Sequence, residues 1–175
     1  MRTRAFLLAT IVLLLATAGM AFAGGAGGVQ FGTQYFDSRW ANTNMETAYI
    51  GGFGYGVSPW GERIGGFGTA LISLGQETAG GVGGLLLGQE LRSGPLTVAA
   101  VLLGGAGGGA VRGRGYMLLF GEADLELGLA LLPWMQVVAY AGYQMWANVV
   151  PGTPFKSAAL STPVFGIRIA WGSFR

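Results

Sequence analysis

Hydrophobic residues alternate with polar or small residues along much of the chain. The clearest example is residues 121–132, GEADLELGLALL, in which Glu122, Asp124 and Glu126 occupy every second position and leucines lie between them. On an α-helix, where each residue is rotated by about 100° from the last, Asp124 would point well away from the other two carboxylates. On a β-strand, the three carboxylates share one face and the leucines share the other. The pattern therefore predicts a strand with one polar and one apolar face.

The same period of two recurs in other segments, many of them bounded by glycine or proline. In residues 134–146, for example, apolar side chains alternate with Gln136, Tyr140 and Gln144. The alternation is less clear in residues 82–92 and 95–104, because both faces of these segments carry apolar side chains. The sequence predicts eight strands in all, at residues 28–36, 48–57, 63–74, 82–92, 95–104, 116–131, 134–146 and 164–171.

The composition of the polar faces distinguishes between two all-β architectures. These faces carry mainly Gly, Ala, Thr, Ser and Gln, which are too small and uncharged for the solvated surface of a soluble β-sandwich. A closed barrel satisfies every backbone hydrogen bond in lipid, and eight strands enclose an interior just wide enough for side chains to fill. The sequence therefore predicts an all-β, antiparallel transmembrane β-barrel, with its apolar faces toward lipid and its polar faces toward the lumen.

This architecture also predicts an ion network inside the barrel. Glu122, Asp124 and Glu126 would face the lumen, and Arg168 is the only charged residue in the final predicted strand, where it shares a face with Gly166 and Ala170. Strands six and eight lie about 10 Å apart, a gap that two side chains can bridge. Because a buried charge without a partner is costly, we expect Arg168 to pair with the acidic residues. We expect Arg63, or lumenal water, to take a share of the remaining negative charge.

The first 23 residues have the pattern of a signal peptide. Arg2 and Arg4 give a positive start, residues 5–18 are apolar, and Ala21-Phe22-Ala23 forms a small-x-small cleavage site. The alternative is a membrane anchor, since residues 5–23 are just long enough to span a bilayer. We expect an exported protein with a signal peptide at residues 1–23 and a single barrel domain at residues 24–175.

The residue types that are missing exclude much catalytic chemistry. The chain has no Cys and no His, so it can form no disulfide, no Ser–His–Asp triad and no His-based zinc site. Its only lysine, Lys156, lies outside any phosphate-binding loop, and a hydrolase that used carboxylates alone would need a second acidic cluster. Without residues 1–23 the chain has eight basic and eight acidic residues, a balance that does not suggest nucleic-acid binding. We expect no enzymatic activity, no metal and no cofactor.

The pattern resembles the small eight-stranded outer-membrane barrels of Gram-negative bacteria, the kind related to OmpX and the membrane domain of OmpA. The resemblance covers residues 28–175 and rests on the alternation, including the apolar and aromatic residues from Phe165 to Trp171 in the final strand. In that family the final strand usually ends in Phe, whereas here Phe174 is followed by Arg175 and has the opposite parity to Trp171. The resemblance implies a structural, adhesive or interaction role in the outer membrane, without catalysis. The expected partners are membrane lipids and, through the loops, a protein or lipopolysaccharide.

The sequence leaves two alternatives to a filled barrel open. If the lumen were open, the acidic residues would favour cations, and the protein would be a narrow pore or transport element. The second alternative is helical: Gly80, Gly84 and Gly88 repeat every four residues, the spacing that lets membrane helices pack closely, and predict a glycine-zipper hairpin over residues 69–111.

Tryptophans and glycines suggest two further hypotheses about the barrel. Trp134 and Trp146 bound one predicted strand, with a spacing that suits aromatic girdles at the two membrane interfaces. The alternating glycines Gly52, Gly54 and Gly56 would make room in the lumen for larger side chains opposite them.

Overall fold

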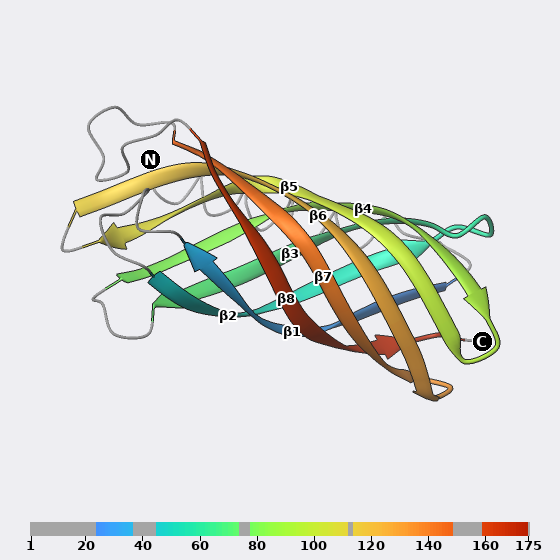
Figure 1. The fold of residues 1–175 in the computed structure, drawn as a ribbon. Helices are drawn as coiled ribbons and strands as arrows, with labels where there is room; N and C mark the ends of the chain where they lie inside the picture. Colours follow the sequence, from blue (N-terminus) through green and yellow to red (C-terminus); the bar gives the residue numbers. More distant parts are fainter. Residues whose placement is uncertain (1–23, 37–44, 74–77, 112–113, 149–158, 175) are drawn as a thin grey trace, which may run out of the picture.

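The structure is a computed structural model that describes residues 24–36, 45–73, 78–111, 114–148 and 159–174. Its strands form a closed antiparallel barrel in chain order, in which β8 returns to pair with β1 (Figure 1). The strands are β1 (Gly24–Phe36), β2 (Met45–Val57), β3 (Glu62–Ser73), β4 (Thr78–Ser93), β5 (Leu96–Val111), β6 (Arg114–Leu132), β7 (Met135–Asn148) and β8 (Ala159–Gly172). The prediction of an all-β, eight-stranded antiparallel barrel is confirmed. Residues 1–23 lie outside the described residues, so the signal peptide stays a prediction.

Several strands are longer than the alternation predicted. Strand β5 continues from the predicted end at residue 104 to Val111, through the glycine-rich stretch GGAGGGAV. Glycine has no side chain and therefore contributes no alternation signal, so the sequence pattern could not show that the strand continues here. Gly80 and Gly81 of β4 pair with Gly109 and Gly108 of β5.

The prediction of a glycine-zipper helical hairpin is wrong. Residues 69–73, 78–93 and 96–111 belong to strands β3, β4 and β5. In the described part of the chain, no helix is long and apolar enough to cross a membrane. The four-residue spacing of Gly80, Gly84 and Gly88 is also a multiple of two, so it places all three on one face of a strand.

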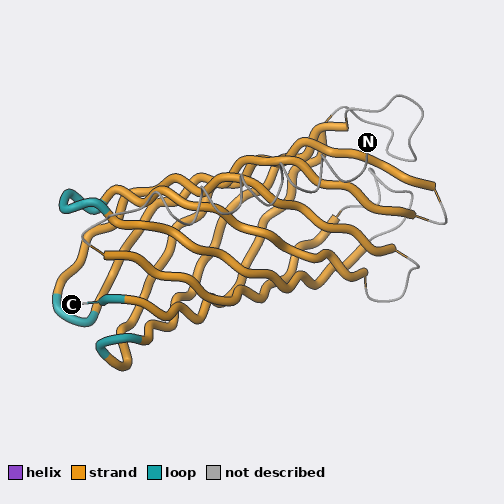
Figure 2. The backbone as a smooth tube through the Cα atoms, turned by 180° about the vertical axis from the view of Figure 1, so that it is seen from behind, coloured by secondary structure: helices purple, strands orange, loops and turns teal. Residues whose placement is uncertain are grey.

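Three short turns close hairpins at the same end of the barrel as the C-terminus (Figure 2). They comprise residues 58–61, 94–95 and 133–134, and we call this end the turn end. Gly61 and Gly94 have positive φ angles of 85° and 58°, a conformation that glycine adopts without steric cost. Proline or glycine in each turn stops the preceding strand, as the sequence predicted.

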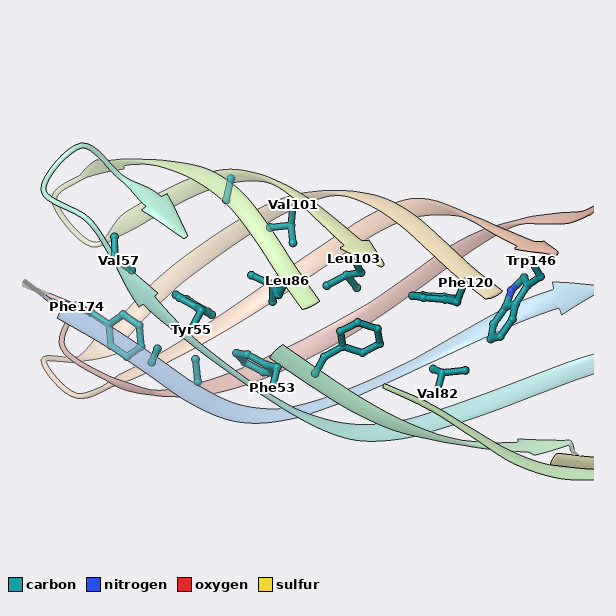
Figure 3. Close-up of a cluster of buried hydrophobic side chains, with 14 of the residues drawn as sticks. Phe53, Tyr55, Val57, Val82, Leu86, Val101, Leu103, Phe120, Trp146 and Phe174 are labelled. Carbon is teal, nitrogen blue, oxygen red and sulfur yellow. The ribbon is translucent and has the colours of Figure 1, made fainter. Parts of the chain in front are cut away.

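Side chains of opposite parity face the outside and the lumen. In β6, Leu125 is 69% exposed and Leu127 57% exposed on the outside, as expected for a wall in contact with lipid. Hydrophobic side chains also fill much of the interior (Figure 3). The largest of these are Phe53, Tyr55, Phe67, Leu86, Leu103, Leu118, Phe120, Trp146 and Phe174.

Strand β2 corrects the hypothesis about its glycines. Its aromatic residues Phe53 and Tyr55 are buried in the interior, whereas Gly52 lies on the outward face with Ile50. The reason is that the surroundings of the barrel can fill the space outside an outward glycine, whereas a closed lumen must be filled by side chains. Inward glycines on neighbouring strands leave room for aromatic side chains of β2: a Cβ at Gly32 of β1 would collide with the Tyr49 hydroxyl. Gly52, Gly54 and Gly56 therefore do not make room in the lumen.

The hypothesis of two aromatic girdles is also wrong. Trp146 is 2% exposed and lies in the lumen, where its Nε1 donates to Gln144 Oε1 at 3.2 Å and its ring packs against Phe120 at 4.8 Å. Trp146 shares parity with Gln144, and β7 has no bulge between them to reverse the faces. Trp134 lies exposed in a turn, at the same end of the barrel as the exposed side chain of Trp60.

Candidate functional site

Strand β6 carries three carboxylates on its lumenal face. Glu122, Asp124 and Glu126 are 7%, 3% and 5% exposed, because the regular alternation of β6 turns every even-numbered side chain inward over this stretch. Strands β3 and β8 contribute two buried arginines, Arg63 and Arg168, each 2% exposed. All five residues that the sequence singled out thus lie inside the barrel.

Arg168 lies among all three β6 carboxylates. Its Nη2 is 2.8 Å from Asp124 Oδ2 and 3.9 Å from Glu122 Oε1, and its Nη1 contacts Glu126 Oε1. Its Nε donates to Gln30 Oε1 at 3.1 Å, and the Tyr140 ring lies 4.0 Å from the guanidinium carbon. These contacts offset the cost of removing the guanidinium from water.

Arg63 extends the network toward the turn end. Its Nη1 is 2.5 Å from Glu126 Oε2 and its Nε is 2.6 Å from Glu90 Oε2. The two oxygens of Glu126 therefore bind two different arginines, Arg168 on one side and Arg63 on the other. Through Glu126, side chains from β3, β6 and β8 are joined across the lumen.

Glu90 and Arg92 of β4 also belong to the network, although the sequence pattern did not single them out. Glu90 is buried, and its Oε1 lies 2.6 Å from Arg92 Nε while its Oε2 binds Arg63. Both faces of β4 carry apolar residues, so the alternation did not reveal which face is lumenal. The available signal was the two-residue spacing of Glu90 and Arg92, since two charges at this spacing share one face of a strand.

Neutral polar side chains complete the surroundings of the charges. Gln144 donates a hydrogen bond to Glu122 Oε2, and the hydroxyls of Tyr49 and Tyr140 bond to each other. Asp124 Oδ1 is buried without a hydrogen-bond partner. Beside Glu122 lies a cavity of about 10 Å³, which is close to the smallest volume that holds one water molecule.

The charges of this network are unequal in number. Among the described residues that are almost fully buried, four carboxylates (Glu90, Glu122, Asp124 and Glu126) face two guanidinium groups, those of Arg63 and Arg168. A third guanidinium, on Arg92, is 26% exposed at the turn end. In the described part of the chain, no group of three or more acidic, His or Cys side chains is arranged to hold a metal ion. The arrangement cross-links strands with charge pairs and leaves some negative charge over.

A comparison with solved structures finds the same fold in the neisserial surface protein A, NspA. The alignment covers 86% of this chain and 96% of that chain, with a TM-score of 0.60 and 8% sequence identity. The chain shares the fold of NspA. No family model and no curated protein matches the sequence. At this identity the likeness to NspA is one of fold, and it assigns no role to the residues of the ion network.

Proposed function

We propose that the chain is a small outer-membrane β-barrel protein with a side-chain-filled lumen and a structural, adhesive or interaction role. The observation that carries the proposal is the bridging of the lumen by Arg168, Glu126 and Arg63, which ties β8, β6 and β3 together. A rigid, cross-linked barrel of this kind serves as an anchor that holds its loops at the membrane surface.

The outer surface supports a location in a membrane. Leucines such as Leu85, Leu91 and Leu125 are about two-thirds exposed or more, and water would solvate so many apolar side chains poorly. The shared fold of a neisserial surface protein supports the outer membrane as that location. Lipids are then the immediate partners of the wall, and we propose that the loops make contact with a protein or with lipopolysaccharide. We propose no catalytic role for the charged residues.

The excess of buried carboxylates favours a second candidate function, a narrow cation-selective pore. Asp124 and Glu122 each keep part of their acceptor capacity free of arginine, and negative side chains in a lumen attract cations. Against this candidate, the aromatic cluster around Phe120 and Trp146 occupies the interior beside Glu122.

Single-channel recording in planar bilayers separates the two functions. For the filled barrel we expect no discrete conductance steps from the refolded protein. Heat-modifiable gel migration of the same sample checks that it is folded. Reproducible cation-selective steps from the unmodified protein would establish the pore and overturn the filled lumen.

A further inference from the structure

The last described residue, Phe174, has its side chain inside the barrel. It is 6% exposed and belongs to the lumenal hydrophobic cluster. Figure 3 places its ring at one end of this cluster, near Val57. The position follows from parity: β8 runs without a bulge, so Phe174 falls on the same face as Arg168 and Ala170. The terminal aromatic residue of this chain therefore packs into the lumen and not against lipid.

Backbone hydrogen bonds hold this terminal segment from both sides. Ser173 N donates to Gly25 O of β1 at 3.1 Å, and Phe174 N donates to Pro133 O in the β6–β7 turn at 3.2 Å. Beyond these two bonds, the position of the segment depends on side-chain contacts.

Arg92 connects the terminal segment to the ion network. Its Nη1 donates to Ser173 O at 3.3 Å, and its guanidinium carbon lies 5.7 Å from the centre of the Phe174 ring. Its Nε lies 2.6 Å from Glu90 Oε1, and the other oxygen of Glu90 binds Arg63. A continuous series of polar contacts thus runs from the C-terminal backbone to Arg63.

Solvent reaches this point from outside the barrel. A cavity of about 340 Å³ opens at the turn end, and its lining includes Trp60, Glu90, Arg92 and Ser173. The contacts of Arg92 therefore lie at the boundary between bulk water and the buried network.

We propose that Ser173 and Phe174 form a stopper that closes the turn end of the lumen, and that Arg92 latches this stopper to Glu90. The inference rests on the proposed filled lumen and adds to it the residues that close one end. Displacement of the stopper exposes Ala99, a lumenal residue of β5 that is 2% exposed and lies between Glu90 and Glu126 in the strand register.

The test measures how fast a thiol at position 99 reacts. The chain has no cysteine, so Ala99→Cys introduces a single small reporter. The refolded protein is treated with a bulky, water-soluble, cationic methanethiosulfonate, and the rate of modification is followed by mass spectrometry. We expect slow modification of the reporter alone, a rise of more than tenfold when Phe174→Ala is added, and a rate near that of the reporter alone with Phe174→Leu.

Arg92→Met separates the latch from the stopper. It removes the charge and leaves the Phe174 ring in place, and we expect it to raise the rate at least threefold. This variant also keeps the proposal testable if Phe174→Ala does not refold. Trp134→Ala, which removes an exposed aromatic ring at the same end, is the matched control and should leave the rate unchanged.

A second reporter, Val82→Cys, distinguishes local opening from general loosening. Val82 is lumenal and lies eight residues before Glu90 on β4, about 26 Å along the strand. Two results would overturn the stopper. In the first, the rate at position 99 stays within twofold of the reporter alone in both Phe174→Ala and Arg92→Met. In the second, the rate rises equally at both reporters. Conductance of the unmodified protein, by contrast, is the separate result that would overturn the filled lumen.

Discussion

Replacing Arg168 with leucine removes the charge at the centre of the lumenal network. The variant leaves Asp124 Oδ2 without its arginine at 2.8 Å and leaves Glu126 with Arg63 alone. Removing one partner of a buried ion pair costs about 3–5 kcal/mol, because the remaining charge stays buried. We expect Arg168→Leu to lower the free energy of unfolding by about that amount.

Double-mutant cycles assign this loss to particular carboxylates. At an effective dielectric constant of about 20, the gross attraction is about 6 kcal/mol for the 2.8 Å pair with Asp124 and about 4 kcal/mol for the 3.9 Å pair with Glu122. Desolvation offsets most of both energies, and only the pair with Asp124 includes a charge-assisted hydrogen bond, worth about 1.5–3 kcal/mol. We therefore expect a coupling of about 2–3 kcal/mol between Arg168→Leu and Asp124→Leu, and below about 1 kcal/mol with Glu122→Leu.

The assay is equilibrium unfolding in urea of the protein refolded into lipid vesicles, followed by tryptophan fluorescence. Glu62→Gln changes an exposed carboxylate at the turn end and serves as the control, with an expected effect within about 0.5 kcal/mol. Additive losses in the cycle of Arg168 with Asp124 would mean that these two charges do not interact in the folded barrel.

Three other predictions concern the orientation of side chains and the start of the mature chain. Leu127→Arg should destabilise the barrel in vesicles by about 2–4 kcal/mol, because Leu127 faces outward; labelling of Leu127→Cys by a water-soluble reagent in vesicles would contradict this orientation. Gly166→Ala should cost about 1–3 kcal/mol, because its Cβ would collide with the backbone carbonyl of Phe31 and with the Tyr140 hydroxyl. Gly104→Ala, which meets open space, is its control and should change the unfolding free energy by less than about 1 kcal/mol; equal losses for the two would argue against the lumenal packing. Mass spectrometry of the membrane-extracted protein should find residues 1–23 absent, and an intact Met1 would indicate an anchor.

Alternation alone was enough to predict which face of a strand is lumenal where each face has one chemical character. In β6 the carboxylates and leucines assign the two faces without knowledge of any neighbouring strand, and in β8 Arg168 stands out for the same reason. Predicting that Arg168 pairs with the carboxylates of β6 across the barrel required only the number of strands. The roles of Glu90 and Arg92 were not accessible in this way, because β4 carries apolar residues on both faces and their contacts come from β3 and from the chain end.

Short-turned, antiparallel strands with one face suited to lipid follow from the sequence alone, because a period of two and the turn residues are local properties. The lumenal face of β2 became clear only in the closed barrel, since its aromatic side chains point inward where glycines on neighbouring strands leave room, as Gly32 does for Tyr49. The folded barrel also decided what the inward rings contact, which parity does not give: Phe120 for Trp146 and Arg92 for Phe174. Whether a given aromatic ring faces lipid or lumen depends on the space that the other strands leave, and that space exists only once the barrel has closed.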